Sequence, residues 1–166
     1  EGQQLQRCDK CNWTHYQGTH IAVVAMLTDP TVERIVLVQR NREPYKGQWA
    51  LPGGFVTHAR LELPIDAMRR ELWEELRVMV HPVRYCGTRI STDDPRAPGH
   101  TIMFYHVPLI IEGFELLDKR TTNADPEENR AVRVFSRADV PSLAFESHRE
   151  MWQRLRDGVI SEGGEQ

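Results

Sequence analysis

The chain has 166 residues, which is enough to bury one sizeable core but rarely two. Its composition, 40% hydrophobic and 27% charged, is that of a globular protein, and no apolar run is long enough to cross a bilayer. A formal net charge of -3 gives no general attraction to nucleic acid or to a membrane surface, so we expect neither as a partner. The N-terminus carries no basic start followed by an apolar stretch, so we expect a cytoplasmic protein.

Residues 1–19 form a short polar appendage that contains the pair Cys8-x-x-Cys11. Two cysteines at this spacing are half of a zinc ribbon, but a closed structural zinc site needs four ligands. Two nearby histidines and the distant Cys86 are all that could complete it, so reduced thiols are favoured over bound zinc at Cys8 and Cys11. The total of three cysteines also argues against a secreted disulfide framework.

The first half of the main segment alternates apolar runs with turns. Residues 21–27 predict a strand buried on both faces, and residues 34–40 predict a second strand that pairs with it as a hairpin. The stretch WALPGGFV at 49–56 contains a Pro-Gly-Gly break, where the backbone must turn sharply. A helix follows at about 64–77, with proline tolerated in its first turn and Leu63 as a poor N-cap.

The second half of the chain contains further β-rich runs and one more helix. Strands are predicted at 85–90, 100–111 and 131–135, the last of them after a long polar loop at 119–130. The helix is predicted from Ser147 to about Asp157, because Ser147-x-x-Glu150 has capping-box spacing and Gly158 can end a helix.

No repeat, linker or low-complexity tract divides the chain. We therefore expect one α+β domain at residues 20–157, with a sheet of mixed direction covered by two main helices. The appendage at 1–19 precedes this domain, and residues 158–166 are expected to form a disordered tail.

The helix predicted at 64–77 gathers carboxylates. At about 100° per residue its apolar residues form one stripe, and Glu71, Glu74 and Glu75 share the adjoining arc. Three like charges at these spacings repel one another, which costs stability unless a cation relieves it. Clustered carboxylates suit hard ions such as Mg²⁺ or Mn²⁺. On spacing alone, a solvated charged face with an ordinary Arg70 to Glu74 pair is the alternative.

The surrounding sequence resembles the signature of the Nudix family, G-x5-E-x7-R-E-U-x-E-E-x-G-U, in which U is a bulky aliphatic residue. Seven residues separate Glu62 from Arg70, and Arg70 opens the stretch RELWEE, which matches R-E-U-x-E-E. The resemblance implies a Nudix-like α/β/α sandwich. It also implies that Glu71, Glu74 and Glu75 are catalytic ligands of a Mg²⁺ or Mn²⁺ cofactor.

The same resemblance implies supporting roles for other residues. Gly53 and Gly54 form the entrance to the signature, and Glu62 is expected to form a salt bridge with the arginine of the signature that fixes the helix to its loop. In the downstream acidic loop, Glu128 is the candidate general base or extra metal ligand, with Glu127 second. A solvent-facing loop carboxylate is the equally weighted alternative for Glu128.

Two departures from the signature concern the ends of the helix. Seven residues separate Gly54 from Glu62 where the signature has five, so the loop at 57–61 is lengthened by two. An alignment held from the glycine would instead place Arg60 at the position of the glutamate. We prefer the lengthened loop, because loops absorb insertions more easily than helices do. Arg77 stands where the signature has glycine, so we expect another exit geometry there.

Nudix enzymes cleave a nucleoside diphosphate linked to another group, so the resemblance implies attack of water on a pyrophosphate phosphorus. The candidate residues for binding a nucleotide-type substrate are Arg40 for the phosphates, Trp49 and Tyr105 for base stacking, and Arg60 in the lengthened loop. Packing in the core is the alternative for Trp49. The stretch VPSLAFESH at 140–148 resembles the tail of ADP-ribose-type members, so we lean towards ADP-ribose or a related dinucleotide as substrate.

Two other classes of protein stay open. A catalytically silent Nudix fold that senses a nucleotide is motivated by the lengthened loop and by Arg77, whereas the intact R-E-U-x-E-E stretch counts against it. A zinc ribbon protein with an incidental acidic helix would require stoichiometric zinc and ranks last, although the start CDKCNWTHY resembles the remnant of a zinc ribbon in NADH-pyrophosphatase-type members. A homodimer is an open possibility for any of these classes.

Overall fold

The computed structural model describes residues 6–7, 10, 14–15, 20–57, 61–95, 98–109, 117 and 126–160. The predictions at Cys8, Cys11 and Arg60 lie outside these residues, and the division of the chain at residues 19 and 157 stays a prediction. Strands β1 (Gln6–Arg7) and β2 (Thr14–His15) pair with each other in antiparallel fashion.

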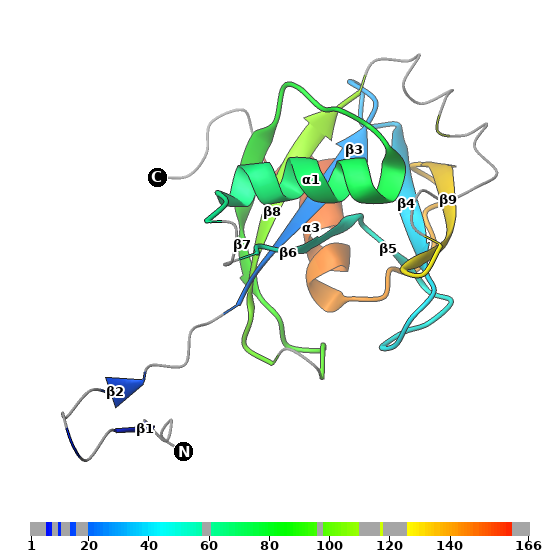
Figure 1. Cartoon of the computed structure of the whole chain (residues 1–166). Coiled ribbons are helices and arrows are strands. Elements are labelled where there is room, and N and C mark those ends of the chain that lie inside the picture. Colours follow the sequence, from blue (N-terminus) through cyan, green and yellow to red (C-terminus); the bar gives the residue numbers. More distant parts are fainter. Residues whose placement is uncertain are drawn as a thin grey trace.

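A mixed, seven-stranded sheet forms the centre of the molecule (Figure 1). Its strands are β3 (Ile21–Thr28), β4 (Arg34–Arg40), β5 (Trp49–Ala50), β6 (Gly53–Phe55), β7 (Arg84–Ile90), β8 (Thr101–Pro108) and β9 (Asn129–Ser136). The main order is β5-β4-β3-β8-β7, with β6 paired to β3 and β9 paired to β4. Strands β3 and β8 run parallel and the other pairs are antiparallel, so the predicted mixed sheet is confirmed.

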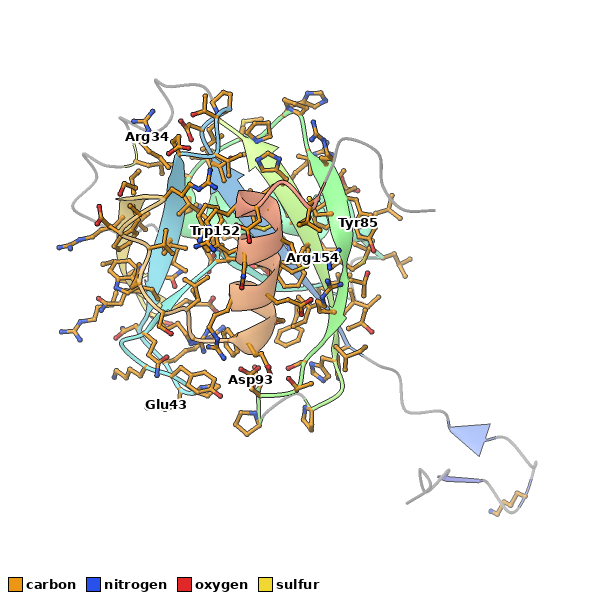
Figure 2. The ribbon with its side chains drawn as sticks, turned by 180° about the vertical axis from the view of Figure 1, so that it is seen from behind. Arg34, Glu43, Tyr85, Asp93, Trp152 and Arg154 are labelled. Atoms are coloured by element: carbon orange, nitrogen blue, oxygen red, sulfur yellow. The ribbon has the colours of Figure 1, made fainter. Side chains whose placement is uncertain are left out.

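Strand β3 is buried on both faces, as its unbroken apolar run predicts. Val23, Ala25 and Leu27 belong to the core cluster that helix α1 (Pro64–Leu76) covers. Val24 and Met26 face the opposite cluster, which helix α3 (Glu146–Arg156) covers. The two helices therefore lie on opposite faces of the sheet, α1 in front in Figure 1 and α3 in front in Figure 2, which confirms the α/β/α sandwich.

The predicted pair of β3 and β4 is antiparallel, but its ladder is limited to Thr28 opposite Ile35. The turn between them is closed by the Asp29 carboxylate, which accepts the backbone N–H groups of Glu33 and Arg34 at 2.8 Å each. Beyond the turn the strands separate, because β3 pairs with β6 on that side and β4 pairs along its length with β9. Strand β6, which leads into the helix that carries the carboxylates, is thereby part of the sheet.

Helix α1 begins after Leu63 without a side-chain cap, as predicted, and ends at Leu76. Arg77 adopts the left-handed conformation (φ 53°, ψ 39°) that a glycine would take there, so the prediction of another exit geometry is wrong. The Arg77 N–H donates to the carbonyl of Trp73 at 3.0 Å, and its guanidinium lies 5.6 Å from the centre of the Trp73 ring. These contacts help to offset the steric cost of a left-handed arginine.

Arg77→Gly is expected to raise the free energy of unfolding by about 0.5 kcal/mol, because the roughly 1 kcal/mol cost of the left-handed conformation is removed while the contact with Trp73 is lost. Urea denaturation measures the change. Arg77→Ala is the control, since it loses the same contact but keeps a Cβ, and it should be less stable than the parent chain. If the glycine variant is no more stable than the alanine variant, the left-handed conformation of residue 77 carries no steric cost and the prediction is wrong.

Helix α3 begins at Glu146, one residue before the predicted start, and the predicted capping box of Ser147 and Glu150 is wrong. Phe145 occupies the N-cap position, which places Ser147 inside the first turn. The Glu146 N–H instead donates to the carboxylate of Asp93 at 2.7 Å, from the segment after β7 (Figure 2). A side chain distant in sequence thus supplies the cap. No helix in the described part of the chain is long and apolar enough to cross a membrane.

Candidate active site

A cleft opens where the start of β6, helix α1 and the turn before β9 meet. Its lining includes Gly53, Gly54, Glu75, Glu128 and Asn129. The cleft therefore brings together the two glycines, the carboxylate helix and the acidic loop that the sequence separates by as many as 76 residues.

Arg70 organises the carboxylates of α1 and the loop before it. Its guanidinium donates two hydrogen bonds to Glu62, from Nε to Oε2 at 3.1 Å and from Nη2 to Oε1 at 2.9 Å. Its Nη1 donates at 2.8 Å to both Glu71 and Glu74. The hydrogen bonds from Arg70 lower the pKa of Glu62 to about 2. The pair that the family resemblance implies is therefore present, and it extends to two carboxylates of the helix.

Glu75 lies at the base of the cleft, with the residue only 4% exposed. Its carboxylate accepts the Gly53 N–H at 2.9 Å and the Asn129 side-chain N–H at 2.9 Å. Burial raises the pKa of Glu75 to about 8, and the negative charges of Glu71 and Glu128 act in the same direction. Sequence reasoning missed Asn129, whose sole signal was its place directly after the candidate Glu128.

Glu71 is also buried, and its carboxylate lies directly against Gly54. A Cβ on Gly54 would stand 2.5 Å from Oε1 and 2.6 Å from Oε2 of Glu71. Burial raises the pKa of Glu71, and the charges of Glu74 and Glu128 contribute in the same sense. Glu74 is the outer member of the three, with its side chain 45% exposed.

Gly54→Ala is expected to displace the Glu71 carboxylate and to lower the apparent affinity for Mg²⁺ by about 10–100-fold, the range typical when a group that orients a ligand is lost. The fold should survive, because the clash is with the end of a flexible side chain and Gly54 has no positive φ. Titration of activity with Mg²⁺ measures the change. At Gly53 a Cβ would instead strike the Val23 carbonyl, so Gly53→Ala should unfold the chain and serves as the contrast. An unchanged Mg²⁺ dependence in Gly54→Ala would show that the close approach of Gly54 to the Glu71 carboxylate does not affect metal binding.

Glu128 stands at the edge of the cleft, whereas Glu127 is exposed and is not among the residues that line it. The Glu128 carboxylate forms an ion pair with Arg42, at 2.5 Å between Oε1 and Nη2. Its carbonyl accepts the Asn41 N–H at 2.8 Å, which ties the acidic turn to the end of β4. The charge of Glu128 reaches both buried glutamates of α1, since it raises their pKa values.

The predicted substrate-binding residues fall into two groups. Arg40 lines the cleft, where its Nε donates to a backbone carbonyl at 2.7 Å and its guanidinium lies 5.0 Å from the centre of the Phe145 ring. Trp49 packs edge-on against an aromatic ring of β9, and Tyr105 is buried in the core at 5% exposure; neither lines the cleft. Arg60 lies outside the described residues.

The carboxylates are held by protein donors, and no three His, Cys, Asp or Glu side chains within the described segments form a ready-made metal site. The donor set nevertheless suits a hard divalent cation. Glu71, Glu75 and Glu128 offer oxygen ligands alone, and the negative charge of Glu128 disfavours ionisation of both Glu71 and Glu75. A cation among them would relieve that repulsion.

Comparison with known proteins agrees with this geometry. The model of the NUDIX domain matches residues 18–155. The ADP-ribose pyrophosphatase of Methanocaldococcus jannaschii is 31% identical over 136 residues, covering 80% of this chain and 73% of the relative. Among solved structures, a MutT NUDIX hydrolase from Burkholderia pseudomallei has a TM-score of 0.69 at 22% identity, covering 84% of this chain and 99% of that chain.

A second solved structure shares the fold. The NUDIX domain of Shewanella oneidensis NrtR complexed with ADP ribose has a TM-score of 0.69 at 22% identity and covers 87% of this chain and 90% of that chain. The residues matched by the family model, 18–155, include every residue that lines the cleft. The chain belongs to the NUDIX family and is a Nudix pyrophosphohydrolase.

Proposed function

We propose that the chain hydrolyses the pyrophosphate bond of ADP-ribose or a related dinucleotide with the help of Mg²⁺ or Mn²⁺. The observation that carries this proposal is the burial of Glu71 and Glu75 beneath Gly53 and Gly54, within reach of the charge of Glu128. Buried carboxylates that repel one another destabilise the folded protein, and such clusters are typical of functional sites. ADP-ribose is favoured because the archaeal relative that is 31% identical is an ADP-ribose pyrophosphatase.

In this proposal Glu71, Glu74 and Glu75 hold the cation, and Glu128 is a further ligand or the general base. A bound Mg²⁺ neutralises phosphate oxygens and lowers the pKa of a water molecule. As the general base, Glu128 would accept the proton of the attacking water, and release from Arg42 would leave its carboxylate free to do so. Arg70 keeps the glutamates of α1 in register through its contacts with two of them.

The pyrophosphate at the middle of the substrate meets the positive side chains of the cleft. Arg40 and Arg42 both line it, and their guanidinium groups suit bidentate contact with phosphate oxygens. Asn129 and the Gly53 N–H position Glu75 by donating to opposite oxygens of its carboxylate. Water attack on either phosphorus of ADP-ribose breaks the P–O–P bridge and yields AMP and ribose 5-phosphate.

A hydrolysis screen tests this proposal. ADP-ribose, dinucleotides, nucleotide sugars and nucleoside triphosphates are each incubated with the protein and Mg²⁺ or Mn²⁺, and the products are identified by mass spectrometry. We expect ADP-ribose or a dinucleotide to be the best substrate, with no turnover when the metal is chelated. Preferred turnover of triphosphates would contradict the substrate class. Tight binding of ADP-ribose without turnover of any compound would favour the nucleotide sensor instead.

A further inference from the structure

Part of the cleft wall takes no role in the proposed reaction. It comes from the start of α3, which contributes His148, from the segment after β7, which contributes Asp94, and from β8, which contributes Ile102. His148 is 5% exposed and Asp94 is 8% exposed, so both polar side chains are buried at this wall. A buried hydrogen-bond donor without an acceptor costs free energy, so the hydrogen bonding of His148 decides what this part of the wall can bind.

The hydrogen bonding of His148 determines its tautomer. Its Nδ1 accepts the backbone N–H of Leu51 at 3.2 Å, so a neutral imidazole must carry its proton at Nε2. Burial lowers the pKa of His148 to about 3, and the positive charges of Arg40 and Arg149 act in the same direction. The ring is therefore neutral near pH 7, and Nε2–H is a hydrogen-bond donor.

The ring of His148 is held in place from two sides. The ring of Phe104 lies at 5.8 Å and 89°, and the ring of Phe145 at 4.9 Å and 54°. Within the part of the chain that the structure describes, the Nε2–H of His148 has no protein acceptor. Because Nδ1 points to Leu51 and His148 lines the cleft, the donor on the other side of the ring is available to a bound molecule.

The neighbouring lining indicates which part of a substrate meets this donor. Leu51 and Ile102 contribute apolar surface, and Asp94 contributes a carboxylate, which repels a phosphate but accepts hydrogen bonds from hydroxyl groups. An uncharged group with both apolar surface and hydroxyl or carbonyl oxygens matches this wall, and a nucleoside has that chemistry.

We propose that His148, with Asp94 and Ile102, forms a nucleoside subsite, in which His148 Nε2–H donates to an oxygen of the ribose or base and determines substrate specificity. This inference rests on the proposed function, because it assumes that the same cleft takes a nucleoside diphosphate compound. His148 is a binding residue here and takes no part in the bond cleavage.

Paired substitutions separate the two nitrogens of His148. In His148→Asn the side-chain oxygen can still accept the Leu51 N–H, but the shorter amide places no N–H at the position of Nε2. In His148→Gln the side-chain amide can place an N–H near the position of Nε2. Binding of ADP-ribose and of inorganic pyrophosphate to the metal-loaded protein is measured by titration calorimetry at low temperature, together with KM and kcat for ADP-ribose.

We expect His148→Asn to weaken ADP-ribose binding by about tenfold, the effect of one lost hydrogen bond of about 1.4 kcal/mol. KM should rise by a similar factor with kcat changed less than twofold, pyrophosphate binding should stay within twofold, and His148→Gln should restore most of the ADP-ribose affinity. His81→Asn, at an exposed histidine outside the cleft, is the matched control. Equal losses for ADP-ribose and pyrophosphate, or no loss for either, would overturn the subsite.

A measurement on the unmodified protein covers the case in which a variant fails to fold. Nitrogen NMR of the histidine side chains should identify His148 as the Nε2–H tautomer, and addition of ADP-ribose should shift its Nε2 resonance. An unshifted Nε2 resonance at saturating ADP-ribose would overturn the inference. This binding readout also distinguishes the two proposals, because absence of hydrolysis with a shifted resonance rejects the proposed function and leaves the subsite standing.

Discussion

Glu75→Gln is expected to lower kcat for pyrophosphate hydrolysis by at least about 100-fold, a loss of roughly 2.7 kcal/mol or more in transition-state stabilisation. The reason is that Glu75 is the most enclosed carboxylate of the cleft and is held by donors on both oxygens. An amide of the same shape keeps the packing and both hydrogen bonds when the Asn129 amide turns so that its oxygen accepts the new N–H, but it removes the charge that would bind a divalent cation. Steady-state kinetics at saturating Mg²⁺ measures the loss.

The same substitution should make the metal-free protein more stable at neutral and alkaline pH. Burial raises the pKa of Glu75 from 4.5 to about 8, so the stability contributed by its protonated form is complete below pH 4.5 and is lost as the pH rises through about 8. Glu75→Gln carries no ionisable group at this position. Its advantage over the parent chain, measured by thermal unfolding with a chelator present, should therefore grow between pH 4.5 and 8.

Metal removal supplies the complementary result. Mg²⁺ should raise the melting temperature of the parent chain, because it binds the folded state alone, and should have little effect on Glu75→Gln. Asp66→Asn is the matched control, since it makes the same chemical change at an exposed position of the same helix. Turnover of Glu75→Gln within a few-fold of the parent would reject Glu75 as a metal ligand.

Arg70→Ala is expected to lower the free energy of unfolding by about 3 kcal/mol, the lower end of the range for removing one partner of a buried ion pair. Its side chain is 17% exposed, and its loss leaves Glu62, Glu71 and Glu74 without their shared donor. Arg70→Lys should recover part of this stability at most, because an ammonium cannot reproduce the two parallel bonds to Glu62. Chemical denaturation measures both variants.

The effect of Arg70→Ala should depend on pH in a defined direction. Arg70 lowers the pKa of Glu62 from 4.5 to about 2, so the stability of this pair is present above pH 4.5 and is lost as the pH falls through about 2. The difference between parent and variant should shrink over that interval. Arg69→Ala is the control, since Arg69 and Asp66 form an exposed pair worth roughly 0.5 kcal/mol or less. Equal losses for both arginines would contradict the central role of Arg70.

The local pattern of the sequence was sufficient for the carboxylate helix. Helical periodicity places Glu71, Glu74 and Glu75 beside the apolar stripe, and the resemblance to the Nudix signature implies the pairing of Glu62 with Arg70 that the structure contains. The sequence also predicted correctly that β3 is a strand and α1 a helix, because β3 is an unbroken apolar run and the apolar residues of α1 recur with a helical period. Arg77 shows the limit of residue identity, since the chain retains the left-handed helix exit although the glycine that favours it is absent.

Partners distant in sequence could not be predicted in this way. The capping box predicted at Ser147 did not form, because the Asp93 carboxylate accepts the Glu146 N–H and caps the helix from another element. A local capping pattern does not show whether a residue distant in sequence will cap the helix in its place. Tyr105 was a candidate for base stacking, but the register of the sheet points its side chain into the core. Periodicity states which residues share a face, whereas the pairing of strands decides which face meets the cleft.

The sequence by itself determined the fold class and the carboxylate helix, because these depend on hydrophobic periodicity within each element, and the pairing of Glu62 with Arg70 followed from the resemblance of the sequence to the family signature. Tertiary structure alone decided that Asn129 binds Glu75 and that Arg42 holds Glu128. These contacts depend on the pairing of β9 with β4, which brings together segments that no local spacing relates. Short-range sequence pattern therefore identifies the carboxylates of the site, whereas the long-range pairing of strands decides which side chains contact them.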